Sequence, residues 1–530
     1  MIACAAKLPD GAPPRPRTAP WRRMLEDTAT PTRSTWRPLD WMGVVVAVVA
    51  ALLLFLQTRG VGLMGHDSYP LILTSRIHSG GDLLGTFTEQ LMDGRYHGAY
   101  FRPLLNLSFA LDEAIWGLDA FGYQLTNALL FAGAALALHA FARRALGAGG
   151  GFGALIAVAF FALHESHFEV VPVPARRPEL LCALFACAAL AAQLRPSALA
   201  ARWPVLGPLL MLAAAASKET GYALPAVAVL AVYLYSEASG RRARLVHAGR
   251  AAIAYAVPIA ALLGLRLWVL GGLGGPAALP PGYEGPGTFE LSATLFDRLL
   301  VPQSATSGSA WLGALALFAG LGVAKSWFLG GRSKAGGPAP AAPLAARQGL
   351  LLAVAWSLIV GALYGVSRSI EQWYLFLPVV GLSLLIGSGA QLLLLQWRRG
   401  GPLVRASAVG ATLLLLAFCG FQLRYTPLVH RYTEWARATT ASDEFFEKLA
   451  RRIERAAPGA SVNAPPIPVW VPPAPTGPAV RGGAVLEDYS VQAWCELRFP
   501  DRRLRVLKAP PRTPLLAGES AVLLLRPYPF

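Results

Sequence analysis

Long apolar segments dominate the chain from about residue 41 to residue 421. A helix that crosses the hydrocarbon core of a membrane needs about 17–25 predominantly apolar residues. Runs of roughly this length, separated by polar connections, predict about eleven membrane spans. They are 41–57, 121–142, 151–170, 178–194, 203–217, 221–236, 250–270, 309–329, 348–366, 372–396 and 403–421. The pattern predicts an all-α polytopic membrane bundle over residues 41–421.

The segments around these spans have a different character. Residues 1–40 are rich in Pro, Arg and Thr and lack the apolar core of a signal peptide, which predicts a disordered cytoplasmic tail before an uncleaved signal anchor. Residues 58–120 contain short apolar runs that suit helices lying in the membrane interface, and 331–347 reads as a Pro/Ala/Gly linker. Residues 422–530 combine a helical pattern at 432–456 with strand-like runs at 484–501 and 521–530. We predict a small extracytoplasmic α+β domain there.

The distribution of positive charge sets the expected orientation. Only 15% of the 530 residues are charged, against about 25% in soluble domains, and the formal net charge is +17. Arg and Lys gather in alternate connections between spans, which marks those connections as cytoplasmic. No groove-reading or base-stacking motif accompanies the charge, which argues against nucleic-acid binding. The five cysteines show neither zinc-ligand nor redox spacing.

Ionisable side chains at the predicted outer ends of the spans are the candidates for chemistry, because such groups are costly at membrane depth. His66 and Asp67 follow the first span. A carboxylate there would accept the proton of an acceptor hydroxyl during glycosyl transfer, or would only cap the next helix. His164, His167 and Glu169 form a second group with helical spacing. We interpret it as a substrate-binding network, with a divalent-cation site and a solvated helix end as alternatives.

A third group consists of cations, and a fourth is an aromatic segment. The cations could balance the developing charge of a phosphate leaving group, although each could also be an interfacial anchor. Glu371 and Tyr374 lie in a segment suited to holding a sugar by hydrogen bonding and stacking, or to forming an aromatic belt. The cations of the third group are Arg102, Arg176, Arg177, Lys218 and Arg368.

These motifs, in chain order, resemble a known family. They read DSYPLI, YFRPLLNLSFALDEAIWGLDAFGYQLTN, FALHESHFEVV, SKETGYALP and EQWYLFLPVVGL. Over residues 60–400 they are similar to the membrane core of the GT-C superfamily, in particular to the tetratricopeptide-linked protein O-mannosyltransferases and their bacterial relatives. The resemblance implies a polyprenyl-phosphate sugar donor and a catalytic carboxyl group at Asp67. The other residues at recurrent motif positions are Arg102, Glu169, Arg177, Lys218, Glu219, Glu371 and Tyr374.

The sequence also departs from the family pattern. His66 and Ser68 flank Asp67 where a second acidic residue is often found, and Gln124 and Glu165 stand where His and Pro are common. Residues 422–530 take the place of the tetratricopeptide tail. These departures bear on the acceptor and on whether the chain is catalytically active.

We therefore expect a membrane glycosyltransferase that moves a sugar from a polyprenyl-phosphate donor to a hydroxyl of a protein, lipid or glycan. Asp67 and Glu169 are the expected catalytic residues, and a divalent cation is the one cofactor that the side chains near them could bind. A lipid-linked substrate transporter is the first alternative, although paired half-repeats with broken helices are not visible. A non-catalytic scaffold is the second. The composition suggests a bacterial inner membrane with the active face outward. The expected substrate contacts are His66, His164, His167, Glu219, Glu371 and Tyr374.

Overall fold

A computed structural model defines the architecture of most of the chain. The residues that it describes are 38–94, 99–147, 149–201, 203–275, 287–301, 341–365, 371–399, 401–426, 433–456, 467–471, 488–502, 504–508 and 522–523. The predicted span 309–329 and the tail 1–37 lie outside them.

Within this described part, five helices are long and apolar enough to cross a membrane. They are Pro38–Thr58, Ala120–Ala145, Arg241–Leu270, Leu344–Tyr364 and Trp373–Arg398. Shorter apolar helices cover Gly151–Leu163, Leu206–Ser217, Glu219–Tyr235 and Ala408–Arg424. The chain is thus an all-α, multi-pass integral membrane protein, while the larger number of about eleven spans stays a prediction.

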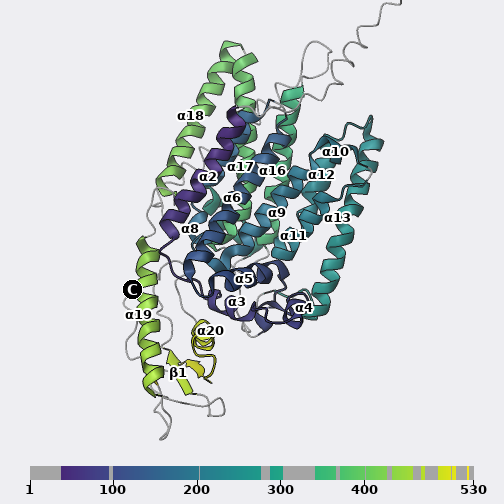
Figure 1. The fold of residues 1–530 in the computed structure, drawn as a ribbon. Coiled ribbons are helices and arrows are strands. Elements are labelled where there is room, and N and C mark those ends of the chain that lie inside the picture. The colour runs from purple at the N-terminus through teal and green to yellow at the C-terminus, as the bar shows by residue number, and fades with distance from the viewer. Residues whose placement is uncertain are drawn as a thin grey trace, which may run out of the picture.

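The helices pack side by side into one bundle (Figure 1). Prolines stand in the first turn of α5, α9 and α12, where the missing N–H costs nothing because it would have no helical partner. The bundle elements are α2 (Pro38–Thr58), α6 (Ala120–Ala145), α7 (Gly151–Leu163), α9 (Arg177–Gln193), α10 (Pro196–Ala200), α11 (Leu206–Ser217), α12 (Pro225–Tyr235), α13 (Arg241–Leu270), α14 (Thr288–Leu300), α16 (Ala341–Gly365), α17 (Phe376–Arg399) and α18 (Pro402–Tyr425).

Short elements gather at one end of the bundle, opposite α10 (Figure 1). In α4, Ser79 and Asp82 form a reciprocal capping box, while Leu83 and Leu84 stay exposed, as expected of a helix lying in the interface. These elements are α3 (Ser68–Thr74), α4 (Gly80–Thr88), η1 (Leu91–Gly94), α5 (Pro103–Trp116), α8 (His167–Val170), η2 (Pro174–Arg176), η3 (Glu219–Tyr222) and η5 (Gln372–Leu375).

The C-terminal segment contains α19 (Thr433–Ala456), β1 (Ile467–Val471), α20 (Asp488–Arg498), β2 (Leu504–Lys508) and β3 (Val522–Leu523). The strands form a parallel sheet in the order β2-β1-β3, with Ile467 opposite Leu504 and Val469 opposite Val522. Val491, Trp494 and Cys495 of α20 pack in one apolar cluster with Phe446 of α19. Whether 422–530 forms a separate α+β domain stays a prediction.

Three local predictions were wrong. The predicted span 151–170 ends at Leu163, because His164 has an extended backbone and caps α7, so that His164 and His167 do not share a helix. The strand-like run 484–501 contains helix α20, whose buried positions 491, 494 and 495 follow helical spacing. Residues 341–347 of the predicted linker belong to α16.

Helices α7 and α17 cross in close contact through two glycines. A Cβ atom built on Gly153 would lie 2.6 Å from the carbonyl oxygen of Gly387, and one built on Gly387 would lie 2.8 Å from the Cβ of Ala157. At Gly389, in the same helix, no atom lies within 4 Å of such a Cβ. The crossing therefore depends on the absence of a side chain at two positions.

This difference gives a matched pair of variants. We expect Gly387→Ala to destabilise the bundle by about 1–3 kcal/mol, because the helices must separate to accept the methyl group. Gly389→Ala should leave stability unchanged or raise it by up to about 1 kcal/mol through helix propensity. Thermal unfolding of both variants in detergent measures the difference, and equal midpoints would refute the close contact.

Candidate functional site

Asp67 lies at the start of α3, in the loop that follows the first span. The loop can approach residues 173–175 closely because Gly65 has a φ of +88° and no side chain. A Cβ on Gly65 would come within 2.6 Å of Val173 Cγ1. Non-glycine residues rarely adopt a positive φ, so Gly65 allows the loop to lie beside the segment before Arg176.

The segment 171–173 is held from the other side by α6. The side-chain amide of Asn127 donates to the carbonyls of Val171 (3.1 Å) and Val173 (3.3 Å). The amide of Gln124 donates to Pro172 (2.7 Å). Both amides are buried, and buried polar groups are rarely left without such partners. They fix a short loop that carries Arg176 and Arg177.

Arg177 is fully buried and forms an ion pair at the start of α9. Its Nη2 lies 2.5 Å from Asp112 Oδ2, and its Nε donates to Asn127 Oδ1 at 2.9 Å. Its Nη1 donates to the carbonyl of Ser108 at 3.0 Å. The guanidinium thus joins α5, α6 and α9. A phosphate could reach it only by breaking this pair, so the geometry supports a structural role for Arg177 rather than the predicted contact with the donor.

Arg176, one residue earlier, has a different environment. It is half-buried, and its Cζ lies 3.2 Å from the ring centroid of Trp373, so that the guanidinium stacks on the indole. Its Nε and Nη2 have no hydrogen-bond partner among the residues that the structure describes. Burial lowers the pKa of Arg176, an effect that the negative charges of Asp67 and Glu169 oppose, and an arginine remains charged under such conditions. The structure thus brings Asp67, Glu169 and Arg176 within electrostatic reach of one another.

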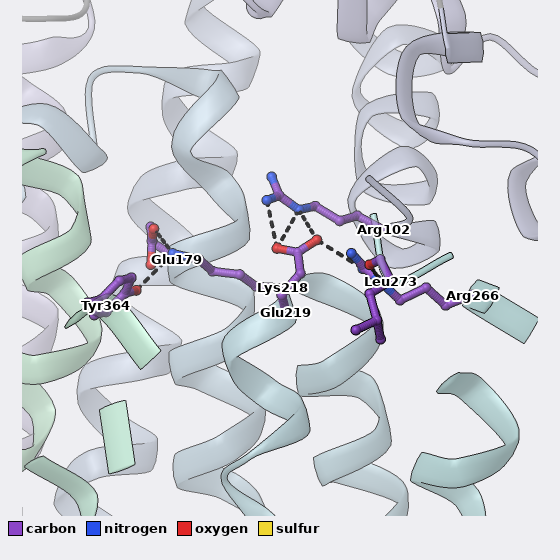
Figure 2. A network of polar contacts seen from close by, with 7 residues as sticks. All are labelled: Arg102, Glu179, Lys218, Glu219, Arg266, Leu273 and Tyr364. Atoms are coloured by element: carbon purple, nitrogen blue, oxygen red, sulfur yellow. Dashed lines mark hydrogen bonds and ion pairs between the residues drawn. The ribbon is translucent and has the colours of Figure 1, made fainter. Parts of the chain in front are cut away.

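Lys218 forms a buried ion pair with Glu179 of α9 (Figure 2). Its Nζ also donates to the hydroxyl of Tyr364 at 3.0 Å and lies 5.3 Å from the ring centroids of Tyr364 and Tyr374. These two rings are stacked, with centroids 5.1 Å apart. The predicted sugar-contacting Tyr374 therefore lies beside the predicted phosphate-binding Lys218.

The next residue, Glu219, accepts hydrogen bonds from two arginines (Figure 2). Arg102 Nη2 lies 2.7 Å from Glu219 Oε2, and Arg266 Nη1 lies 3.2 Å from Glu219 Oε1. Burial alone would lower the pKa of Arg102, but its pairing with Glu219 raises it above the ordinary value. Glu219 thus binds two cations, and its contact with a substrate stays a prediction.

His164 and His167 are fully buried. His164 Nδ1 accepts from the backbone N–H of Ser166 at 3.1 Å, so Nε2 carries the proton and donates to the carbonyl of Leu299 at 3.1 Å. His167 Nε2 contacts the carbonyl of Phe161, and its ring packs against Phe131 and Phe376. This arrangement supports a structural role for both imidazoles instead of the predicted contact with a substrate.

The remaining predicted site residues have varied positions. Glu371 is half-buried and caps η5, next to Tyr374, while Glu169 is buried in α8. Arg368 lies outside the described residues. Across the described ranges, no three His, Cys, Asp or Glu side chains gather closely enough to hold a metal ion.

Sequence reasoning missed several residues that complete these clusters. Asp112, Glu179, Arg266 and Tyr364 supply the partners of the predicted cations. A signal existed for Glu179, which follows Arg177 by two positions at a predicted helix start. Arg266 and Tyr364 stand alone in apolar spans, where an isolated polar residue already indicates a buried partner.

Comparison with known proteins gives one sequence relative. Over 189 residues the chain is 30% identical to protein O-mannosyl-transferase Tmtc1 of Drosophila melanogaster, a match that covers 34% of this chain and 21% of that protein. The chain is thus a distant homologue of this transferase, and the match spans only about a fifth of the length of the transferase. No protein-family profile matches the chain.

Solved structures show only weak likeness. ArnT from Cupriavidus metallidurans, bound to undecaprenyl phosphate, has a TM-score of 0.45 at 17% identity, over 89% of this chain and 86% of that one. The oligosaccharyltransferase of Archaeoglobus fulgidus has a TM-score of 0.43 at 13% identity, over 89% of this chain and 64% of that one.

The adjacent arginines should differ sharply on substitution. Arg177→Met leaves Asp112 buried without its partner, and breaking a buried pair in this way costs about 3–5 kcal/mol. We expect little folded protein from it, and recovery in the double variant Arg177→Met/Asp112→Leu. Arg176→Met should lose much less stability, about 1 kcal/mol, because it gives up the contact with the ring of Trp373 but breaks no ion pair. Fluorescence-detected size-exclusion chromatography after heating measures all three, and a stable Arg177→Met would contradict the assigned role.

Because His164 and His167 are buried, we expect the stability of the fold to decrease at acidic pH. Burial lowers the pKa of His164 to about 4 and of His167 to about 3, whereas both groups titrate near 6.5 when unfolded. Below about pH 6.5 these two histidines bind protons in the unfolded state but not in the native state. The free energy of unfolding therefore falls as the pH is lowered, by up to about 1.4 kcal/mol per pH unit for each histidine.

Replacing one of these imidazoles should reduce the loss. We expect His167→Phe to flatten the decline of the unfolding midpoint between pH 6.5 and about 4, since an aromatic ring is kept among its neighbours. His78→Gln changes an exposed histidine and should leave the slope as in wild type. Equal slopes for His167→Phe and wild type would show that His167 does not remain neutral.

Proposed function

We propose that this chain is a membrane glycosyltransferase that moves a sugar from a polyprenyl-phosphate donor to a hydroxyl acceptor at the outer face of the bundle. The observation that carries the proposal is that a partly exposed carboxylate, Asp67, lies within electrostatic reach of the stacked, incompletely hydrogen-bonded guanidinium of Arg176. One group suits an acceptor hydroxyl, and the other suits a phosphate.

Arg176 is the best candidate for the leaving group among the predicted cations. Lys218 and Arg102 already have carboxylate partners, so a phosphate would gain less from them. The N–H groups of Arg176 that lack protein acceptors could donate to phosphate oxygens, and such charge-assisted bonds are strong. Trp373 fixes the plane of the guanidinium in advance, which lets it stabilise developing charge without reorganising.

Asp67 is the best candidate for the base. In the proposed step the acceptor oxygen attacks the anomeric carbon, and its proton moves to Asp67. The bond from the anomeric carbon to the phosphate oxygen breaks, and the polyprenyl phosphate leaves with the electron pair next to Arg176. This single displacement inverts the anomeric configuration. Glu169, predicted as catalytic, is buried near Arg176 and is better suited to balancing its charge.

The sequence relationship supports the same chemistry. The motifs around Asp67, Arg102 and Lys218 resemble those of the O-mannosyltransferases, and the homologue in Drosophila melanogaster carries that activity in its name. Mannose and a serine or threonine hydroxyl are accordingly the first donor sugar and acceptor to test. We extend the proposal to a location of the site at the outer face, as the loop charges predict, and to a bacterial inner membrane, as the composition suggests.

A transfer assay in proteoliposomes tests the proposal. With undecaprenyl-phosphate mannose and a Ser/Thr peptide, we expect Asp67→Asn to reduce kcat by about 10²–10⁴-fold, the range for losing a general base. Arg176→Gln should also reduce kcat, because leaving-group stabilisation is lost. Asp501→Asn, at an exposed aspartate, serves as the control. Full activity of Asp67→Asn would overturn the assignment of the base, and repeating the assay with EDTA tests the divalent cation.

A further inference from the structure

Helix α20 of the C-terminal segment lies against α3 (Figure 1). The hydroxyl of Tyr489 donates to Asp67 Oδ1 at 3.0 Å, across 422 positions of sequence. The neighbouring Ser490 donates to the backbone carbonyl of His66 at 2.5 Å. Two consecutive residues of α20 thus hold the dipeptide that contains the proposed base.

His66 completes this contact. Its Nε2 lies 3.5 Å from Asp67 Oδ2, and its ring meets the ring of Tyr489 edge to face, with centroids 6.1 Å apart. Each carboxylate oxygen of Asp67 therefore faces a different protein group. A carboxylate oxygen has two lone pairs, and the side chain remains 25% exposed, so room for an acceptor hydroxyl persists.

The C-terminal segment is anchored near Asp67 on both sides. The backbone N–H of Gly62 donates to Thr439 Oγ1 at 3.0 Å. On the opposite side, Tyr69 packs edge to face against Phe446, with centroids 5.3 Å apart. Phe446 in turn stacks on Trp494 of α20. These contacts make the placement of Tyr489 a property of the packed segment and not of a single side chain.

We propose that Tyr489 is a positioning residue for the reaction, which orients the carboxylate of Asp67 toward the acceptor from a segment outside the membrane bundle. The inference rests on the proposed role of Asp67 as base. Catalysis by a general base requires that the carboxylate point at the hydroxyl within hydrogen-bond reach, and small losses of orientation reduce rate more than binding. The competing idea, in which Tyr489 blocks the site until it is displaced, predicts opposite results.

The first experiment compares Tyr489→Phe with wild type in the assay above, at saturating donor. We expect kcat to fall about tenfold while the acceptor KM stays within about twofold, because the phenol orients the base and does not bind the acceptor. Arg451→Ala, at an exposed residue of α19, is the control that should leave both constants unchanged. An unchanged or raised kcat for Tyr489→Phe would overturn the proposal. If Asp67→Asn loses activity while Tyr489→Phe keeps it, the positioning role is refuted but the proposed transferase function is not.

A second experiment locks the segment in place. A Cβ on Gly62 would lie 3.2 Å from Thr439 Cγ2, so a cysteine sulfur in place of that methyl group would lie within reach of a cysteine sulfur at position 62. We expect Gly62→Cys/Thr439→Cys to cross-link on oxidation and to keep its transfer activity, since the docked segment is the active arrangement. Each single-cysteine variant controls for oxidation. Failure to cross-link would refute the docking, and a cross-linked but inactive enzyme would identify the segment as a block.

Discussion

The buried pair of Arg177 and Asp112 is the interaction on which the end of the bundle that carries Asp67 depends. It lies where α5, α6 and α9 meet, and the oxygen of Asn127 accepts a third contact. Because the amide of Asn127 also binds the carbonyls of Val171 and Val173, the pair and the loop before it are held together. An unpaired buried charge would be costly, so Arg177 must point toward Asp112 and Asn127. This orientation in turn fixes the position of the preceding residue, Arg176.

Much of the fold was predictable because each membrane-spanning helix requires a long run of apolar residues, which is easy to recognise in the sequence. Apolar runs set the positions of helices such as α2, α6 and α17 to within a few residues, whereas α13 begins nine residues before the predicted span 250–270. The prediction failed at His164, where a backbone turn breaks the expected span. Hydropathy registers how apolar a segment is, but not whether its polar end continues the helix or leaves it.

The sequence predicted which residues belong to the candidate site, but not which side chains form ion pairs with one another. Asp67, Arg102 and Lys218 were identified from their positions at predicted outer ends, and these residues do lie at the same end of the bundle. Sequence alone did not separate Arg176 from Arg177, since the two are adjacent and chemically identical. Their different roles depend on which direction each side chain takes at the start of α9, and that is decided by Asp112 and Trp373, far away in the chain.

Lys218 and Glu219 are consecutive, yet they bind partners on different helices (Figure 2). Lys218 contacts α9 and α16, whereas Glu219 contacts the start of α5 and α13. One short turn therefore ties four helices together through ionic and polar contacts. Any displacement of that turn would separate opposite charges on both sides simultaneously, so this part of the molecule should behave as a fixed hub. In the proposed transfer, movements that admit the lipid tail of the donor or release the product would then take place in the peripheral loops around this turn.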